Sequence, residues 1–181
     1  MATKEPATEK PHIETFYGEG NHNGEFSNFW KFTKPIEHII GFGKGKNQKV
    51  VIHNSETAIM LEKASLMDDK DIFEKLKHSK HPSYSKKLGR KVKNWNQKLW
   101  DENIENIALY VLTAKFTSFS QLRDKLISTK NSILVEAAPY DRIWGVGMRS
   151  NDPNIRDPKK WKGQNILGFT LMKVRENISH T

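Results

Sequence analysis

The residues best suited to chemistry in this chain are an acid and a base on one predicted helix, Glu56 and Lys63. Helical periodicity over residues 55–67 places Lys63 about 20° from Glu56 and two turns further along the same stripe. The other members of that stripe are Ile59, Met60, Ala64, Leu66 and Met67. Burying either charge without a partner costs on the order of several kcal/mol. At roughly 10 Å along the helix axis, the two charges cannot pair as neighbours on one turn.

Two interpretations of this pair stay open. In the first, both side chains line a polar cavity, where an acid and an amine could act on a substrate. In the second, Glu56 is a carboxylate favoured by a helix N-terminus, and Lys63 extends its stem along apolar surface to reach water.

A glycine-rich turn after the apolar run 133–137 holds a second set of candidates. They are Glu136, Asp141, Trp144, Gly145 and Gly147. A carboxylate and an aromatic side chain at the end of a strand are typical of a functional site. Asp141 could equally be an ordinary turn residue or the N-cap of a short turn.

The longest predicted helix, at 95–116, carries a lysine on its apolar stripe. The apolar members are Trp100, Ile104, Ile107, Ala108 and Val111. Lys115 falls on the same stripe, but a lysine in the last turn is also favoured by the helix dipole. Trp95 begins this helix and could stack on a base, although a tryptophan more often marks the edge of a core.

Positive charge is concentrated in one segment. The chain has 181 residues, with 30 Lys and Arg against 21 Asp and Glu, and a net charge of +9. The stretch 70–98 contains ten of the basic residues and only two acidic ones, so it carries +8 of that charge. Such a segment indicates an anionic partner, nucleic acid or a phosphate-rich ligand, or else a solvated surface.

Composition excludes several other classes. Zero cysteines exclude a disulfide scaffold, a thiolate metal site and a cysteine nucleophile. His78 and His81 have HxxH spacing but no third ligand nearby, so no metal is expected. No apolar run approaches the roughly 20 residues of a membrane span, and residues 1–12 lack the hydrophobic core of a signal peptide. We therefore expect a cytoplasmic protein with no membrane partner.

The elements that must position these residues predict an α+β fold, a predominantly helical single domain with a small β-sheet. Residues 1–11 are expected to form a flexible tail and 12–181 the domain. Predicted strands cover 13–17, 36–40, 50–53 and 133–137. Predicted helices cover 55–67 with Ser55 as N-cap, 69–77, 84–92, 95–116, 119–128 and 166–177. The alternating glycines of 41–49 could cradle a phosphate, but no helix signal follows directly, which favours a hairpin loop.

Seven stretches, in this order, are similar to the NADAR (YbiA-like) family. They are FYGEG at 16–20, GEFSNFW at 24–30, NSETAIMLEKASLM at 54–67, LGRKVKNW at 88–95, AKF at 114–116, LVEAAPYDRIWGVG at 134–147 and WKGQNILGFTLMKVRENI at 161–178. The resemblance covers roughly residues 13–178. Two features depart from the family's pattern: Thr57 stands where a histidine is usual, and the loop 41–49 is richer in Gly and Lys.

The resemblance implies hydrolysis of an N-glycosidic bond to ribose, without a metal or cofactor. It points most to an ADP-ribosyl glycohydrolase that removes ADP-ribose from guanine in DNA. An N-glycosidase of phosphoribosylamino-pyrimidine riboflavin intermediates and a non-catalytic ADP-ribose- or nucleic-acid-binding module remain the alternatives. The expected substrate carries ADP-ribose or a ribosyl phosphate.

Within that chemistry, Glu56 could stabilise the oxocarbenium-like state and activate water, or Lys63 could attack C1′ and form a Schiff base. The candidate catalytic residues are Glu56, Lys63 and Asp141. The candidate substrate-binding residues are Phe26, Asn28, Arg90, Trp95, Lys115, Trp144 and Gly145. Among these, Asn28 would bind ribose hydroxyls, Trp95 or Trp144 would stack on the base, and Arg90 would meet phosphates.

Overall fold

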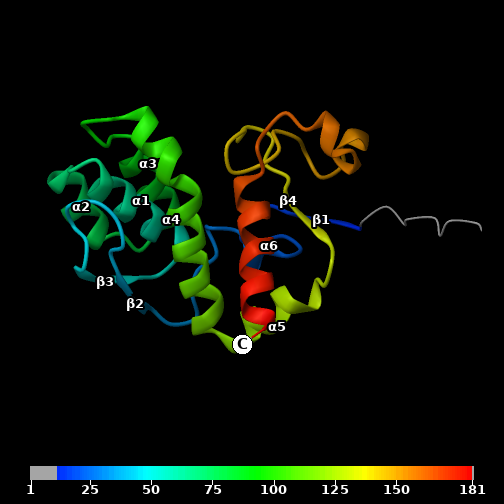
Figure 1. Cartoon of the computed structure of the whole chain (residues 1–181), viewed down its shortest axis with the longest axis horizontal. Helices are drawn as coiled ribbons and strands as arrows, with labels where there is room; N and C mark the ends of the chain where they lie inside the picture. Colours follow the sequence, from blue (N-terminus) through cyan, green and yellow to red (C-terminus); the bar gives the residue numbers. More distant parts are fainter. Residues whose placement is uncertain (1–11, 181) are drawn as a thin grey trace, which may run out of the picture.

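The computed structural model describes residues 12–180, so the tail expected at 1–11 lies outside the described residues. Helices dominate this part of the chain (Figure 1). The α-helices are α1 (Ser55–Leu66), α2 (Lys70–Lys77), α3 (Pro82–Gly89), α4 (Gln97–Ser118), α5 (Ser120–Ser128) and α6 (Ile166–Ser179). The strands are β1 (Ile13–Phe16), β2 (Ile36–Ile39), β3 (Lys49–Ile52) and β4 (Ile133–Glu136). The predicted α+β class is confirmed.

The strands form two separate pairs rather than one sheet. β2 and β3 make an antiparallel hairpin, in which Ile36 is opposite Ile52. β1 and β4 pair in parallel, with Phe16 opposite Glu136. Parallel strands need a long crossover connection, and here most of the helices lie in it. The pairing therefore brings the start of the described chain to the turn that follows β4.

Two large hydrophobic cores lie one on each side of α4, and a smaller third cluster joins Ile13 and Val135 to the turn after β4. One core joins α1, α2, α3 and the β2–β3 hairpin, and the other joins α5, α6, β1 and β4 (Figure 1). Trp144, in the turn after β4, packs against both. Helix α1 is buried around almost its whole circumference, because α2, α3, α4 and the hairpin cover it. Glu56 and Lys63 are therefore carried by the most enclosed helix.

Helix starts differ from prediction where an asparagine competes for the cap. Asn54, not Ser55, is the N-cap of α1, because its Oδ1 accepts a hydrogen bond from the Thr57 N–H at 2.8 Å. Asn96 likewise caps α4, which begins at Gln97 rather than at residue 95 and continues to Ser118. Helix α3 begins at Pro82, where the fixed φ of proline suits the first turn. It ends at Gly89, three residues before the predicted end.

Candidate functional site

Glu56 lies in the first turn of α1 as a buried carboxylate with no side-chain partner. Its backbone N–H donates to the Asn28 carbonyl at 2.9 Å, which ties α1 to the loop after β1. The residue is 6% exposed, and its carboxyl makes no hydrogen bond or ion pair with any residue between 12 and 180. Burial raises the pKa of Glu56 to about 7, against the opposing charge of Lys86. Glu56 can therefore accept or release a proton near neutral pH.

Lys63 lies two turns further along α1 and is partly enclosed by aromatic rings. Its Nζ donates to the Gly89 carbonyl at 2.9 Å and lies 4.5 Å from the ring centre of Trp95. Burial lowers the pKa of the Lys63 amine, while the charge of Glu56 opposes that shift. Gly89 permits this approach of α3 to α1, because a Cβ there would lie 1.9 Å from the Met60 sulfur.

The turn after β4 adds Asp141, whose two carboxyl oxygens have different partners. Its Oδ1 accepts from the backbone N–H groups of Ile143 and Trp144, so it caps the turn. Its Oδ2 lies 3.4 Å from the Nζ of Lys86 on α3. The negative charge of Asp141 also raises the pKa of Glu56. Asp141 therefore belongs to the same group of charges as Glu56.

Glu136 is a further carboxyl of this group that the sequence analysis noticed in the turn but did not assign. It is the last residue of β4, and its Oε2 is buried without a hydrogen-bond partner. Burial raises its pKa to about 8, and the neighbouring charge of Asp141 adds to that shift. The signal in the sequence was an acid at the end of an apolar strand; only the tertiary structure brings it toward α1.

Asn28 and Ser55 add unsatisfied polar atoms beside Glu56. Asn28 is buried, and its Oδ1 has no partner among the described residues. The Oγ of Ser55, next to Glu56 in the chain, is in the same state. Buried polar atoms are nearly always hydrogen-bonded, so such orphans indicate a place for a ligand group or for water.

The other predicted substrate-binding residues differ in how far their side chains are exposed to a ligand. Arg90 is exposed just after α3, and its charge lowers the pKa of both Glu56 and Lys63. Trp95 is 44% exposed above the Lys63 amine, so one face could receive a base. Trp144 is half-buried between the two cores. Gly145 is buried, and a Cβ there would lie 2.8 Å from the Glu136 carbonyl, which assigns it to shaping the turn.

Phe26 and Lys115 have no surface that a ligand could touch in this structure. Phe26 is fully buried and packs edge-on against Phe16 in the second core. Lys115 is also fully buried; its Nζ donates to the backbone carbonyls of Glu25 and Ser27. Burial lowers the pKa of Lys115 to about 7. Both hold the loop that carries Asn28 rather than facing the Glu56 carboxyl.

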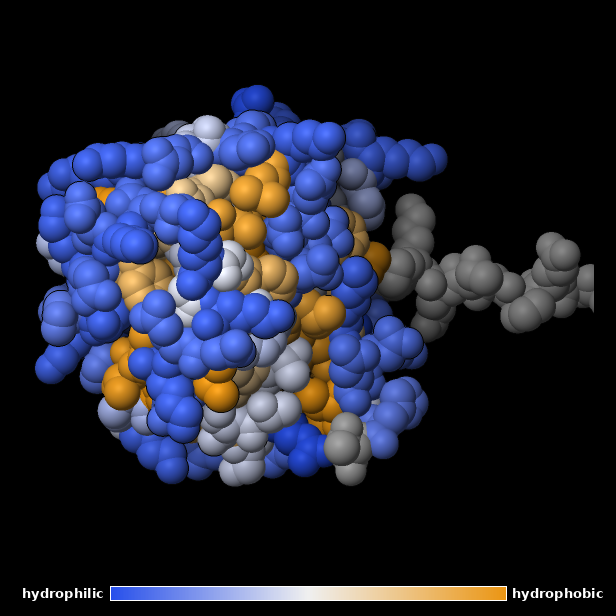
Figure 2. Space-filling model, turned by 60° about the vertical axis from the view of Figure 1, so that its left-hand side comes forward, coloured by the Kyte–Doolittle hydropathy of each residue, from blue (hydrophilic) through white to orange (hydrophobic). Residues whose placement is uncertain are grey.

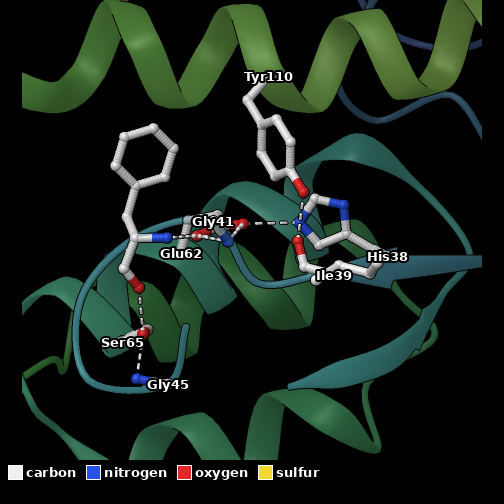
Figure 3. Close-up of polar contacts among 8 residues, drawn as sticks. His38, Ile39, Gly41, Gly45, Glu62, Ser65 and Tyr110 are labelled. Carbon is white, nitrogen blue, oxygen red and sulfur yellow. Dashed lines mark hydrogen bonds and ion pairs between the residues drawn. The ribbon is translucent and has the colours of Figure 1, made fainter. Parts of the chain in front are cut away.

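Sequence reasoning missed a second buried carboxylate of α1, Glu62 (Figure 3). Its Oε1 lies 2.7 Å from the His38 Nε2, and its two oxygens accept the backbone N–H groups of Gly41 and Phe42 at 3.0–3.1 Å. Ser65, one turn on, donates to the Phe42 carbonyl and accepts from the Gly45 N–H. These bonds fix the loop 41–49, which connects β2 and β3 as a hairpin, to α1.

Thr57, which stands where the family usually has histidine, points toward α3. Its Oγ1 bonds to the Asn54 Oδ1 at 2.9 Å and to the Ser85 Oγ at 2.7 Å. The residue is fully buried. At this departure from the family's pattern, the side chain therefore joins α1 to α3.

Between residues 12 and 180, no three His, Asp or Glu side chains are grouped so that they could hold a metal ion. In that range no helix is long and apolar enough to span a membrane. A cleft of about 890 Å³ lies beside α6, lined among others by Lys130, Phe169 and Arg175, and none of the candidate residues lines it.

Comparison with known proteins gives one consistent answer. The family model described as the NADAR domain matches residues 15–179. Protein irg-1 of Caenorhabditis elegans is 34% identical over 158 residues, covering 84% of this chain and 74% of that protein. N-glycosidase R617 of Acanthamoeba polyphaga mimivirus is 36% identical over 123 residues, covering 68% of this chain and 72% of that protein.

A solved structure agrees with this assignment. The NMR structure of the Escherichia coli protein YbiA superimposes with a TM-score of 0.72 at 27% identity, covering 94% of this chain and 87% of that one. The match extends over both cores, and the family model spans every candidate residue from Phe26 to Gly145. The chain belongs to the NADAR domain family.

Proposed function

We propose that this protein is an N-glycosidase that hydrolyses the bond between C1′ of a ribose and a nitrogen base. The observation that carries the proposal is the Glu56 carboxyl, which is buried, unpartnered among the described residues and shifted to a pKa of about 7. A carboxyl with these properties is suited to acid–base work at neutral pH. The name N-glycosidase carried by the relative R617 agrees with this chemistry.

In the proposed reaction, Glu56 acts on water and on the charge that develops at the sugar. As the C1′–N bond breaks, its electron pair passes to the base, and the ribose becomes oxocarbenium-like. The ionised Glu56 carboxylate stabilises that positive charge and takes a proton from the water that attacks C1′. The departing base gains a proton, so the products are free base and ribose. The buried Oδ1 of Asn28 can accept a hydrogen bond from a ribose hydroxyl.

Lys63 offers a covalent alternative on the same helix. With its proton removed, its amine could attack C1′ while the base leaves with the electron pair of the C1′–N bond and gains a proton. Opening of the sugar ring then gives a Schiff base, which water hydrolyses to free the amine. The lowered pKa of Lys63 favours the neutral amine. The amine would have to leave the Gly89 carbonyl to which it donates. Borohydride added during turnover would attach the mass of the sugar to Lys63 on this route and leave Lys63 unmodified on the direct one.

For the substrate, we propose ADP-ribosylated guanine in nucleic acid. The observation that favours it is where the charge of segment 70–98 lies: Lys86 and Arg90 act directly on the Glu56 carboxyl. Lys87, Lys91 and Lys93 continue this charge on exposed surface. The side of the molecule with α1–α3 and the hairpin is largely hydrophilic, with apolar patches between (Figure 2). A strand bound there would place its phosphates on these cations while one modified base reaches Glu56.

The test is turnover of two substrates by the wild type and Glu56→Gln. Chromatography of a guanine-ADP-ribosylated oligonucleotide should show the unmodified strand after incubation with the wild type, and no change with Glu56→Gln. A phosphoribosylamino-pyrimidine should be cleaved far more slowly. The reverse preference would make the riboflavin intermediate the substrate. Binding of both without cleavage of either would overturn the enzyme proposal in favour of a binding module.

Salt provides a second readout for the nucleic-acid substrate. Each phosphate neutralised contributes about −0.7 (single strand) to −0.9 (duplex) to the slope of log K against log salt. We expect KM for the oligonucleotide to rise steeply between low and physiological salt, with kcat nearly constant. Neutralising Lys87, Lys91 and Lys93 together should flatten that dependence and leave turnover of a small substrate intact. A KM that ignores salt would contradict the nucleic-acid proposal.

A further inference from the structure

The backbone of Glu136 is held by hydrogen bonds at both its N–H and its carbonyl. Its N–H donates to the Asn165 Oδ1 at 3.0 Å, and its carbonyl accepts the Val146 N–H at 3.0 Å. Asn165 is fully buried in the left-handed conformation, φ 54°, and also donates to the Leu134 carbonyl at 2.9 Å. In the β1–β4 pair, Glu136 lies opposite Phe16. The end of β4 is therefore fixed from several sides.

The carboxyl on this fixed backbone is left unsatisfied. Its Oε2 is buried without a partner, and no side-chain hydrogen bond or ion pair joins Glu136 to another residue of the described chain. Asn165, packed against it, has its Oδ1 and its Nδ2 both bonded. The polar groups around Glu136 are thus hydrogen-bonded, whereas the Oε2 of its own carboxyl is not and could bind a ligand.

The charges that act on Glu136 are those of the Glu56 site. They come from three different elements: Asp141 in the turn after β4, Lys86 on α3 and Glu56 on α1. Lys86 already pairs with Asp141 at 3.4 Å. Lys63 and Arg90 also act on Glu56, whereas Lys86 is the cation that acts on Glu136. Ionising Glu136 beside two other carboxylates is therefore unfavourable. Glu136, whose buried Oε2 has no hydrogen-bond donor, is the carboxyl that these surroundings favour in the protonated form.

We propose that Glu136 is a further catalytic residue, a neutral carboxylic acid that gives its proton to the departing base. This inference rests on the N-glycosidase function proposed above. As the C1′–N bond breaks, the nitrogen takes the bond's electron pair and the proton of Glu136, whose carboxyl is left ionised. Water adds to C1′ and gives a proton to Glu56. Exchange with solvent then removes that proton from Glu56 and returns one to Glu136. Two carboxyls whose surroundings separate their pKa values are the usual basis of such a division of labour.

The order of the two pKa values supports these roles. Burial raises the pKa of Glu136 to about 8 and that of Glu56 to about 7. Three cations oppose the shift at Glu56 and one opposes it at Glu136, so Glu136 more readily keeps its proton. Activity needs one proton on the pair, so it should be bell-shaped in pH, and replacing Glu136 should remove the alkaline side.

The experiment compares wild type, Glu136→Gln and Glu136→Asp on two ribosides. One releases a purine base, which needs a proton, and the other releases 4-nitrophenolate, which does not. We expect Glu136→Gln to lower kcat for the purine riboside by about 10²–10³-fold, the range of general-acid catalysis, with KM little changed. It should barely affect the nitrophenyl riboside. Glu136→Asp keeps a carboxylic acid and should recover part of the loss.

The pH profile supplies a readout that a structural role would not change. The alkaline fall of kcat should disappear in Glu136→Gln and persist in Glu176→Gln, a control at an exposed glutamate of α6. A Glu136→Gln variant with wild-type turnover, or with the alkaline fall intact, would overturn the inference while leaving the N-glycosidase proposal standing. A wild type that cleaves no N-riboside would instead reject the proposed function itself.

Discussion

Helix α1 carries two buried glutamates six residues apart, and they are treated in opposite ways. Glu62 is fully buried and accepts hydrogen bonds from the His38 ring and from two backbone N–H groups of the loop 41–49 (Figure 3). Glu56 is 6% exposed and accepts none from the described chain. The two carboxyls belong to the same helix and the same core, so only their partners distinguish them.

The difference separates a structural acid from a chemical one. A buried carboxylate with several donors is stabilised as an anion and fixes whatever donates to it. A buried carboxyl without donors is destabilised as an anion and holds its proton more tightly. For this reason burial raises the pKa of Glu56 to about 7. A fold that keeps such a group gives up stability for it, which is characteristic of active sites.

The largest effect is expected from Glu56→Gln on turnover. Gln keeps the shape but can neither ionise nor take a proton, so kcat should fall by about 10³-fold or more, within the range of combined base and electrostatic catalysis. Glu62→Gln should keep near-wild-type kcat per folded molecule. Turnover is measured on the same N-riboside with the folded fraction known from circular dichroism. If the two substitutions cost turnover equally, the distinction between the glutamates is wrong.

The free energy of unfolding should show the opposite order, with the larger loss in Glu62→Gln and not in Glu56→Gln. Glu62→Gln replaces one of the oxygens that accept from His38, Gly41 and Phe42 with an amide N–H₂, which faces their donors. Removing one partner of a buried network costs about 3–5 kcal/mol, and we expect a loss of unfolding free energy at the lower end of that range. Urea unfolding at pH 7 measures it, with Glu56→Gln as the matched control. A loss below about 1 kcal/mol would show that the hairpin is held by its apolar contacts instead.

The pH dependence of stability sharpens the same contrast for Glu56. Its folded pKa, about 7, lies above its ordinary value of 4.5, so the folded state keeps the proton longer. The stability that this proton provides is complete below pH 4.5, declines as pH rises and is lost above about 7. Glu56→Gln lacks this loss, so its advantage over wild type should grow from pH 4.5 to 8, up to about 3 kcal/mol. Urea midpoints across pH measure it, and an advantage that shrinks with pH would contradict the burial of Glu56.

The sequence could predict what depends on local pattern. Periodicity located α1 and placed Glu56 and Lys63 on one stripe, and the motif order identified the family. Asn54 and Asn96 outcompeted their neighbours as caps of α1 and α4, and the other helices begin within two residues of their predicted starts. These features depend on residues a few positions apart, which is the range over which propensity and capping act.

What the sequence could not predict depends on contacts across the chain. Glu62 lies off the stripe of Glu56, and its burial follows from packing on every side of α1. The approach of Glu136 and Asp141 to Glu56 follows from β1 pairing in parallel with β4, more than a hundred residues later. Lys115 matched a site pattern but binds loop carbonyls. A polar residue on an apolar stripe thus indicates burial. Whether its role is structural or catalytic depends on the partners that the tertiary structure gives it.

The smallest effect concerns Tyr110, which meets the hairpin from α4. Its hydroxyl donates to the Ile39 carbonyl at 2.7 Å, and its ring packs 5.3 Å from the ring of His38 and covers Gly41, where a Cβ would lie 2.9 Å from the tyrosine. Tyr110→Phe keeps the ring and removes one hydrogen bond. The residue is 38% exposed, so water can reach the freed carbonyl, and we expect a loss of only about 0.5–1 kcal/mol in urea unfolding. Turnover should not change. A loss as large as that of Glu62→Gln would mean that α4, rather than the buried carboxylate of α1, holds the hairpin in place.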